Sequence, residues 1–303
     1  LIYARLLGYL MLESPSDESR DYITYEIIRC DGDNDRMNRL AKLYQDHLLR
    51  PFEEERLMYS SPVEPAPNDH TQAKKAVSWL YIRRRVKIHS SKTLRRDGYR
   101  CMVTGVFDGN YCESLSPVEL QATSPLPSAT GPTNACYIFP LSMNMDLEPE
   151  EEGHPTTHDA GTVWGIIGRF SGIWIEDELN GEKLHRLSNI MTMTMGTRAM
   201  FDGLSLWFEE NTLDTYNVCA TLAGILINLP PVVTFATTDP ALALPDKRYL
   251  KLHAIVCRVA WMSGASEYMR RYDAEHEERK FLARDGSSAE FLTTKLQRAV
   301  LAR

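Results

Sequence analysis

Two apolar segments open the chain. Residues 1–13 (LIYARLLGYLMLE) are almost continuously apolar, and residues 22–30 (YITYEIIRC) follow the polar run SPSDESRD. Short apolar runs bounded by turn-forming residues are typical of strands. We therefore expect a strand in each segment and a small antiparallel sheet at this end of the chain.

A helical pattern follows. Between Asn34 and Arg50 the apolar residues recur at the spacing that places them on one face of a helix. The polar residues 31–34 supply a start signal, and Pro51 is expected to end the helix because it lacks a backbone N–H. Residues 60–70 (SSPVEPAPNDH) have the proline content of a surface linker.

The middle of the chain mixes short strands with helices. A turn at Asp97–Gly98 is expected to lead into a short strand, and a long loop over 109–133 precedes a second strand over 135–139. Residues 161–175 predict a bent helix, and residues 189–210 predict an extended piece, a helix or turn, and another strand.

After residue 245 the pattern predicts two helical runs separated by residues 284–288 (RDGSS). The whole pattern predicts an α+β fold. Its expected parts are an N-terminal strand-and-helix region (1–60), a linker (61–70), a core (71–215) and a mainly helical C-terminal region packed on the core (216–303).

Composition narrows the class of protein. The 303 residues are 43% hydrophobic, as in an ordinary globular protein, and the formal net charge of −7 argues against a surface built to neutralise phosphates. The six cysteines form no CxxC pair, which predicts neither a structural zinc nor a disulfide framework and favours a cytoplasmic or nuclear compartment. The longest apolar stretch, 218–229, is too short for a membrane span.

Three motifs occur in a recognisable order: RRDGYRCMVTGVFD (95–108), NACYIFPLSMN (134–144) and LHRLSNIMTMTMGTRAMFDGLSLWFE (184–209). Together with the flanking segments they resemble the HNH endonuclease domain of proteins known mainly from mushroom-forming fungi. The resemblance covers nearly the whole chain. It implies a ββα-metal core, in which two strands form a hairpin, a helix follows, and each of these three pieces carries one catalytic residue.

The resemblance also identifies three positions as the catalytic set. The histidine that acts as general base in active members corresponds to Tyr137, in the sequence CYIFP, and the central asparagine corresponds to Asn189. The histidine that binds metal corresponds to Arg198, in RAMFD. Only the asparagine is retained, so the resemblance implies a degenerate active site.

The two replacements argue against metal-dependent hydrolysis. Such a site needs a base that titrates near neutrality, whereas tyrosine titrates near about 10. Arginine stays protonated and offers no lone pair to a metal. We therefore expect no metal and no cofactor. Cys136 and Asp202 are the supporting residues of the predicted site. In the alternative explanation, Arg198 pairs with Asp202 one helical turn away and Tyr137 only fills the volume of the histidine.

The leading functional hypothesis is a former nuclease cleft, around Tyr137, Asn189 and Arg198, that binds a small polar or anionic molecule without metal and supports acid/base chemistry such as an isomerisation or cyclisation. A second hypothesis is a pseudonuclease that binds nucleic acid or a protein partner without catalysis. The basic run Arg83, Arg84 and Arg85 would then contact phosphates, although an exposed, solvated helix face explains the same residues.

A third hypothesis is residual nuclease activity, with a metal held by carboxylates such as Asp202 or Asp108. Other candidate residues have simpler explanations. His154 and His158 lie in a proline-containing acidic loop, His253 lies in an apolar helical pattern typical of the core, and Cys136 is expected to be a buried thiol.

Overall fold

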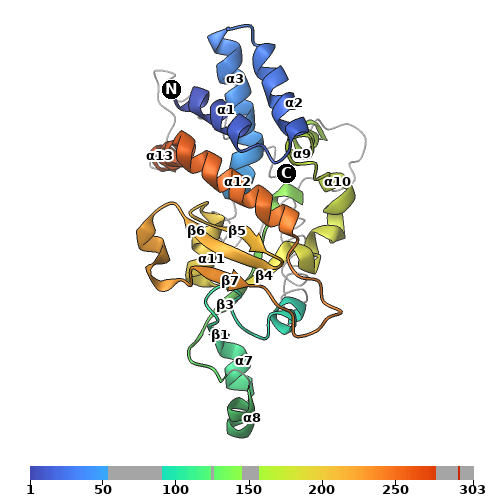
Figure 1. Ribbon diagram of the computed structural model, residues 1–303, viewed down its shortest axis with the longest axis vertical. Helices are drawn as coiled ribbons and strands as arrows, with labels where there is room; N and C mark the ends of the chain where they lie inside the picture. The colour runs from blue at the N-terminus through green and yellow to red at the C-terminus, as the bar shows by residue number, and fades with distance from the viewer. Residues whose placement is uncertain (54–90, 124–125, 145–156, 278–292, 294–303) are drawn as a thin grey trace, which may run out of the picture. The chain divides into compact units, whose positions relative to one another are not determined.

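The computed structural model describes residues 1–53, 91–123, 126–144, 157–277 and 293 (Figure 1). Helices and three small sheets make up an α+β protein, as the sequence predicts. The chain divides into two compact units, and neither is a continuous segment. The first consists of residues 1–54, 140–181 and 255–303, and the second of residues 55–139 and 182–254.

The first unit begins with two helices where we expected two strands. Residues Ile2–Leu12 form α1 and residues Asp17–Ile28 form α2. In α1, Leu6, Leu7 and Leu10 are buried on one face, and Ser16 caps α2 by accepting a hydrogen bond from the Ser19 amide at 3.2 Å. The predicted N-terminal sheet is therefore wrong, because a short apolar run fits a buried helix face as well as a strand.

The predicted helix after residue 34 is confirmed, but Pro51 does not end it. Helix α3 (Asn34–Tyr44) begins at Asp33, whose carboxylate accepts the amides of Asp35 and Arg36. The backbone then widens into a π-helix over Gln45–Leu49 and continues as α4 (Arg50–Glu53). The wider turn lies directly before the proline, where a regular helix would bring its ring against a carbonyl one turn earlier.

The rest of the first unit is also helical. The bent helix predicted over 161–175 is present as α9 (Thr157–Ser171) and α10 (Ile175–Glu178), separated at Gly172 with a φ of +71°. A short 3-10 helix covers Leu141–Asn144. Helix α12 (Lys247–Ser263) enters this unit at Ile255, and Gly264 separates it from α13 (Ala265–Glu277). The predicted break at 284–288 lies outside the described residues.

The second unit contains all the strands that occur in the described residues. Strands β1 (Phe107–Asp108) and β2 (Thr130–Gly131) pair in parallel, and β3 (Thr133–Tyr137) pairs antiparallel with β4 (Ile190–Thr194). Strands β5 (Leu206–Thr212), β6 (Thr215–Ala220) and β7 (Val232–Thr234) form a separate antiparallel sheet (Figure 1). The domain boundary that we expected after residue 215 therefore falls inside β6.

Two local predictions in this unit need correction. The loop expected over 109–133 contains the short helices α7 (Gly109–Ser114) and α8 (Pro117–Ala122), and each begins at a capping side chain, Asp108 or Ser116. The strand expected after Asp97–Gly98 is a turn with one isolated bridge between Arg100 and Phe107.

Helix α11 (Met195–Asp202) follows β4 directly and packs on β3 and β4. The 3-10 helices Gly181–His185, Leu187–Asn189 and Ala223–Asn228 complete the elements. Within the described ranges, no helix combines the length and the apolar character that a membrane span requires.

Candidate functional site

The candidate site is built on the β3–β4 ribbon. Cys136 lies opposite Met191 and Tyr137 lies opposite Ile190, and residues 135–137 and 190–193 are buried. Both faces of the ribbon are therefore covered by protein. Because successive side chains of a strand point to opposite faces, Cys136 and Tyr137 belong to different environments.

Asn189 fastens the two ends of the segment that joins the strands. Its side chain is fully buried, its Oδ1 accepts the Phe139 amide at 2.8 Å, and its Nδ2 donates to the carbonyls of Phe139 at 3.1 Å and Leu184 at 3.0 Å. A buried amide side chain that makes three hydrogen bonds to the backbone fixes the position of that backbone. Asn189 therefore holds the backbone next to Tyr137 and does not face a ligand.

Tyr137 contacts a histidine that the sequence did not single out. Its hydroxyl lies 2.8 Å from Nδ1 of His185, and the two rings meet edge to face at 5.8 Å. Tyr137 is 1% exposed and His185 is 9% exposed. His185 stands in the motif LHRLSN, four residues before Asn189, and this proximity to the predicted asparagine was the only signal that sequence offered for it.

Arg198 lies with the residues on the Cys136 face of the ribbon. Its Nε donates to Asp202 at 3.0 Å, and the Cys136 thiol lies 3.5 Å from the same carboxylate. All three residues are buried. The ion pair that we gave as the alternative is thus present. Burial raises the pKa of Asp202, and the neighbouring Arg198 charge opposes that shift.

The three positions matched to the family therefore do not meet in one cleft. Tyr137 joins His185 on one face of the ribbon, whereas Arg198 pairs with Asp202 on the face that carries Cys136. Asp108, the other carboxylate considered for a metal, caps α7 and accepts the Thr133 hydroxyl at 2.6 Å. In the part of the chain that is described, no three Cys, His, Asp or Glu side chains gather as metal ligands would.

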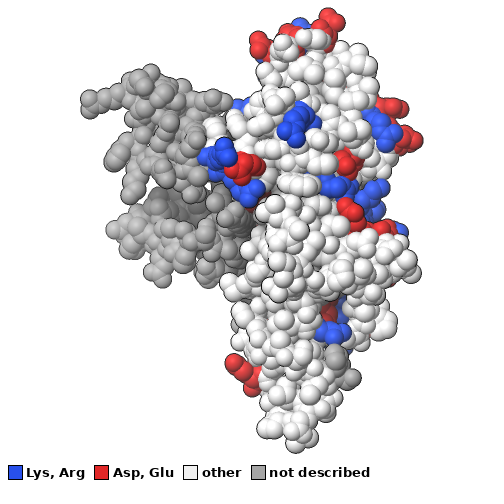
Figure 2. All heavy atoms as spheres, turned by 60° about the vertical axis from the view of Figure 1, so that its left-hand side comes forward, with Lys and Arg blue, Asp and Glu red and all other residues white. Residues whose placement is uncertain are grey.

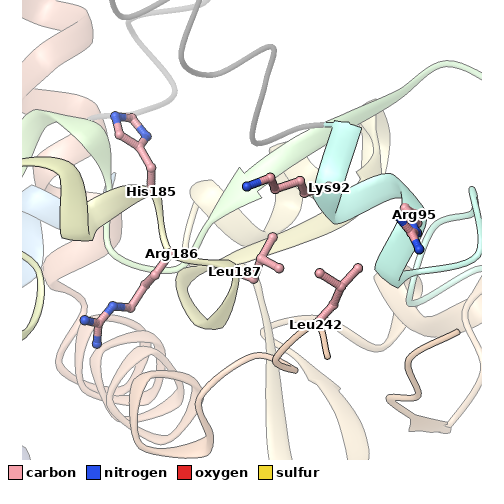
Figure 3. A pocket seen from close by; sticks show the side chains of 6 residues that line it. All are labelled: Lys92, Arg95, His185, Arg186, Leu187 and Leu242. Atoms are coloured by element: carbon pink, nitrogen blue, oxygen red, sulfur yellow. The ribbon is translucent and has the colours of Figure 1, made fainter. Parts of the chain in front are cut away.

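A cavity of about 320 Å³ lies beside His185 (Figure 3). Six described residues line it, none of them a carboxylate: Lys92, Arg95, His185, Arg186, Leu187 and Leu242. In Figure 3 the Lys92 side chain extends from the helical segment 91–96 toward the side of the cavity formed by His185 and Arg186. A volume of this size is at the lower end of the range for small-molecule sites.

Two cationic residues of the lining have no ion-pair partner among the described residues. Arg95 pairs with Asp239 at 2.9 Å, whereas Lys92 and Arg186 form no ion pair with any residue in the described ranges. Cationic residues without such a partner, beside a concave space, favour an anion over a cation.

Buried Arg96 holds the cavity wall together. One of its terminal nitrogens donates to the carbonyls of Leu187 at 2.6 Å and Ala243 at 3.1 Å, and the other donates to Ile190 at 2.7 Å. Both apolar lining segments are thereby tied to the helical segment that bears Lys92 and Arg95. Arg96 is 0% exposed, so its charge is directed into the protein and not to the surface.

Asp97 is the ion-pair partner of Arg96. Its carboxylate accepts hydrogen bonds from the Arg96 guanidinium at 2.5 and 3.0 Å and from the Thr192 amide at 2.9 Å. Burial raises the pKa of Asp97, and Arg96 opposes the shift. The pair covers the outer edge of β4, where the Met102 amide also donates to the Thr192 carbonyl.

No protein-family model matches this sequence, and no curated protein or solved structure is significantly similar to it. We therefore infer function from the β3–β4 ribbon, the cavity and the charged residues beside them.

The remaining candidates lie elsewhere. Arg83, Arg84, Arg85, His154 and the preceding acidic residues are outside the described residues, and His158 is described only as part of α9. On the face drawn in Figure 2, basic and acidic side chains of the described residues are interspersed and do not form one extended cationic patch. His253 is a core residue: it stacks on Phe201 at 3.7 Å, and burial lowers its pKa to about 3.

Proposed function

We propose that this protein binds a small anionic molecule in the cavity beside His185, without a metal, on a ββα scaffold derived from an HNH-type nuclease. The observation that supports the proposal most directly is the lining of the cavity. Lys92 and Arg186 line the space without an ion pair in the described part of the chain, and no carboxylate of the described residues lines it.

The order of the strands and the helix supports descent from an HNH-type nuclease. An antiparallel pair of strands, a clamping asparagine directly before the second strand and a helix directly after it occur in the order that the resemblance implies. The replaced positions support metal independence. An arginine paired with the nearby carboxylate leaves that carboxylate neutralised and places a cation where a metal would be repelled.

Proton transfer to the bound molecule is assigned to His185, with Tyr137 as its positioning partner. If the Tyr137 hydroxyl donates to Nδ1, the neutral imidazole bears its proton on Nε2. Histidine changes its charge near neutral pH, which suits the acid/base step of an isomerisation or cyclisation. Tyr137 is then a residue that fixes the tautomer of His185 and does not itself touch the ligand.

Titration of the full chain with small anions tests the proposal. Benzoate and inorganic phosphate are added with and without EDTA, and the dissociation constants are measured by calorimetry. The variants Lys92→Gln and Arg186→Gln each remove one lining cation, and Lys247→Gln is the matched control because Lys247 lies in the same unit but does not line the cavity.

We expect binding that EDTA leaves unchanged, that weakens about tenfold in each cavity variant and that stays as in the native protein in the control. Equal weakening in all three variants would mean that net charge alone attracts the anion. Binding abolished by EDTA would overturn the metal-independent site.

A further inference from the structure

Most of the surface around the cavity beside His185 is hydrocarbon, although its lining includes a lysine and two arginines. The Arg95 guanidinium pairs with Asp239 at 2.9 Å, and in Figure 3 the Arg186 guanidinium is directed away from Lys92. Both arginines therefore offer the cavity mainly the hydrocarbon of their stems. The Arg186 charge still favours an anion through the electrostatic potential, but it does not share a ligand's head group with Lys92.

Lys92 is the lining cation whose charged group is directed toward another wall of the cavity. Its side chain extends toward the side of the cavity that includes His185 (Figure 3), and it forms no ion pair with any residue in the described ranges. A single ammonium neutralises a single negative charge. A second charge on the ligand would lose hydration without a second cation directed at it. We therefore expect a head group with one negative charge.

The apolar part of the lining comes from two segments that are fixed in place. Leu187 and Leu242 line the cavity, and buried Arg96 donates to the carbonyls of Leu187 and Ala243 at 2.6 and 3.1 Å. Burial of ligand hydrocarbon against this wall contributes to affinity in proportion to the area removed from water. An apolar cavity of about 150 Å³ accepts benzene, so a volume of about 320 Å³ has room for one ring and a short chain.

We propose that the ligand is a small monocarboxylic acid whose apolar body has the size of a phenyl ring on a short chain. Its carboxylate accepts a hydrogen bond from the Lys92 ammonium, and its apolar body lies against Leu187, Leu242 and the arginine stems. This inference rests on the proposed anion-binding function and specifies the ligand of that same site.

Four probes, titrated into the full chain by calorimetry at neutral pH, separate the contributions. 3-Phenylpropionate has the single charge and the apolar body, 3-phenylpropionamide has the body without the charge, acetate has the charge without the body, and phenyl phosphate has a ring with a second charge. We expect 3-phenylpropionate to bind about tenfold more tightly than the amide and about thirtyfold more tightly than acetate. Phenyl phosphate should bind no more tightly than 3-phenylpropionate, because nothing offsets the dehydration of its second charge.

Two variants test the two halves of the site. Lys92→Gln should weaken 3-phenylpropionate about tenfold and leave the amide unchanged. Leu242→Ala should weaken the acid and the amide by the same factor, about threefold to tenfold, and leave acetate unchanged. Lys247→Gln is the control for net charge, since Lys247 is exposed in the same unit and does not line the cavity.

The outcomes distinguish this inference from the proposed function. If phenyl phosphate binds more tightly than 3-phenylpropionate, or acetate binds as tightly, and Lys92→Gln weakens these anions, the monocarboxylic acid is wrong and the anion site stands. If the amide binds as tightly as the acid, if Lys247→Gln weakens binding as much as Lys92→Gln, or if none of the four probes binds, both the ligand class and the anion site are wrong.

Discussion

The Tyr137 hydroxyl lies 2.8 Å from Nδ1 of His185, although the two residues are 48 positions apart in the chain. The hydrogen bond links strand β3 to a histidine on the wall of the cavity. A tyrosine on a strand is thus paired with an imidazole from the 3-10 helix Gly181–His185.

Tyr137→Phe tests this pairing. Removal of the hydroxyl takes away a buried hydrogen bond, and we expect the free energy of unfolding to fall by about 1–2 kcal/mol while the fold is kept. The nitrogen chemical shifts of the His185 ring should show a changed tautomer balance, since the hydroxyl no longer selects one nitrogen. Unchanged ring shifts in the variant would mean that Tyr137 does not set the tautomer.

Arg95 and Arg96 are adjacent, yet they should respond very differently to substitution. Arg96→Leu leaves the buried Asp97 carboxylate without its partner and several carbonyls without a donor, so we expect a loss of about 3–5 kcal/mol in the free energy of unfolding. Arg95→Leu removes an arginine side chain that is 65% exposed and its ion pair with Asp239, with an expected loss below about 1 kcal/mol.

Urea unfolding of the two variants measures this contrast. Its physical basis is that the Arg96 guanidinium joins segments that are distant in the sequence, whereas Arg95 adds one screened surface interaction. Similar losses in the two variants would show that the buried pair does not stabilise the cavity wall as its geometry indicates.

His253 should make the protein less stable in acid. Its pKa is about 3 in the folded state against an ordinary value of 6.5, so below pH 6.5 the unfolded chain binds a proton that the folded chain does not. The free energy of unfolding should then fall by up to about 1.4 kcal/mol for each pH unit between 6.5 and 3. His253→Gln should remove this part of the pH dependence.

The native protein must be compared with the His253→Gln variant because Asp97 and Asp202 change the free energy of unfolding with pH in the opposite direction. Burial raises their pKa values, so the folded state accepts protons from them more readily and their ionisation at higher pH lowers stability. The difference between the native protein and His253→Gln cancels these contributions. A difference that does not change between pH 6.5 and 4 would contradict the assignment of the buried neutral imidazole.

We expect no DNA cleavage by the native protein in Mg²⁺, Mn²⁺ or Zn²⁺, with chelator as the reference. The reason is that position 198 is an arginine paired with Asp202, and position 137 is a tyrosine. The variant with both Tyr137→His and Arg198→His tests whether histidines at these two positions give metal-dependent cleavage. Metal-stimulated cleavage by the native protein that disappears in Asp202→Asn would restore the nuclease hypothesis.

The sequence by itself determined the local elements whose patterns are unambiguous. The helical spacing after residue 34, the order β4–α11–β5 and the short strand before Pro140 were all predicted, because each depends on neighbours within a few positions. The i,i+4 pair of Arg198 and Asp202 was also foreseen as an alternative, since helical geometry alone brings the two side chains together.

Tertiary structure decided what local pattern leaves ambiguous. The apolar segment at residues 1–13 is a helix because it buries one face against other helices of its unit, and its sequence fits a strand equally well. The pairing of Tyr137 with His185, the burial of Arg96 beside exposed Arg95, and the gathering of Lys92 with Arg186 around one cavity each join distant segments. Such contacts depend on how the segments pack, which no spacing along the chain encodes.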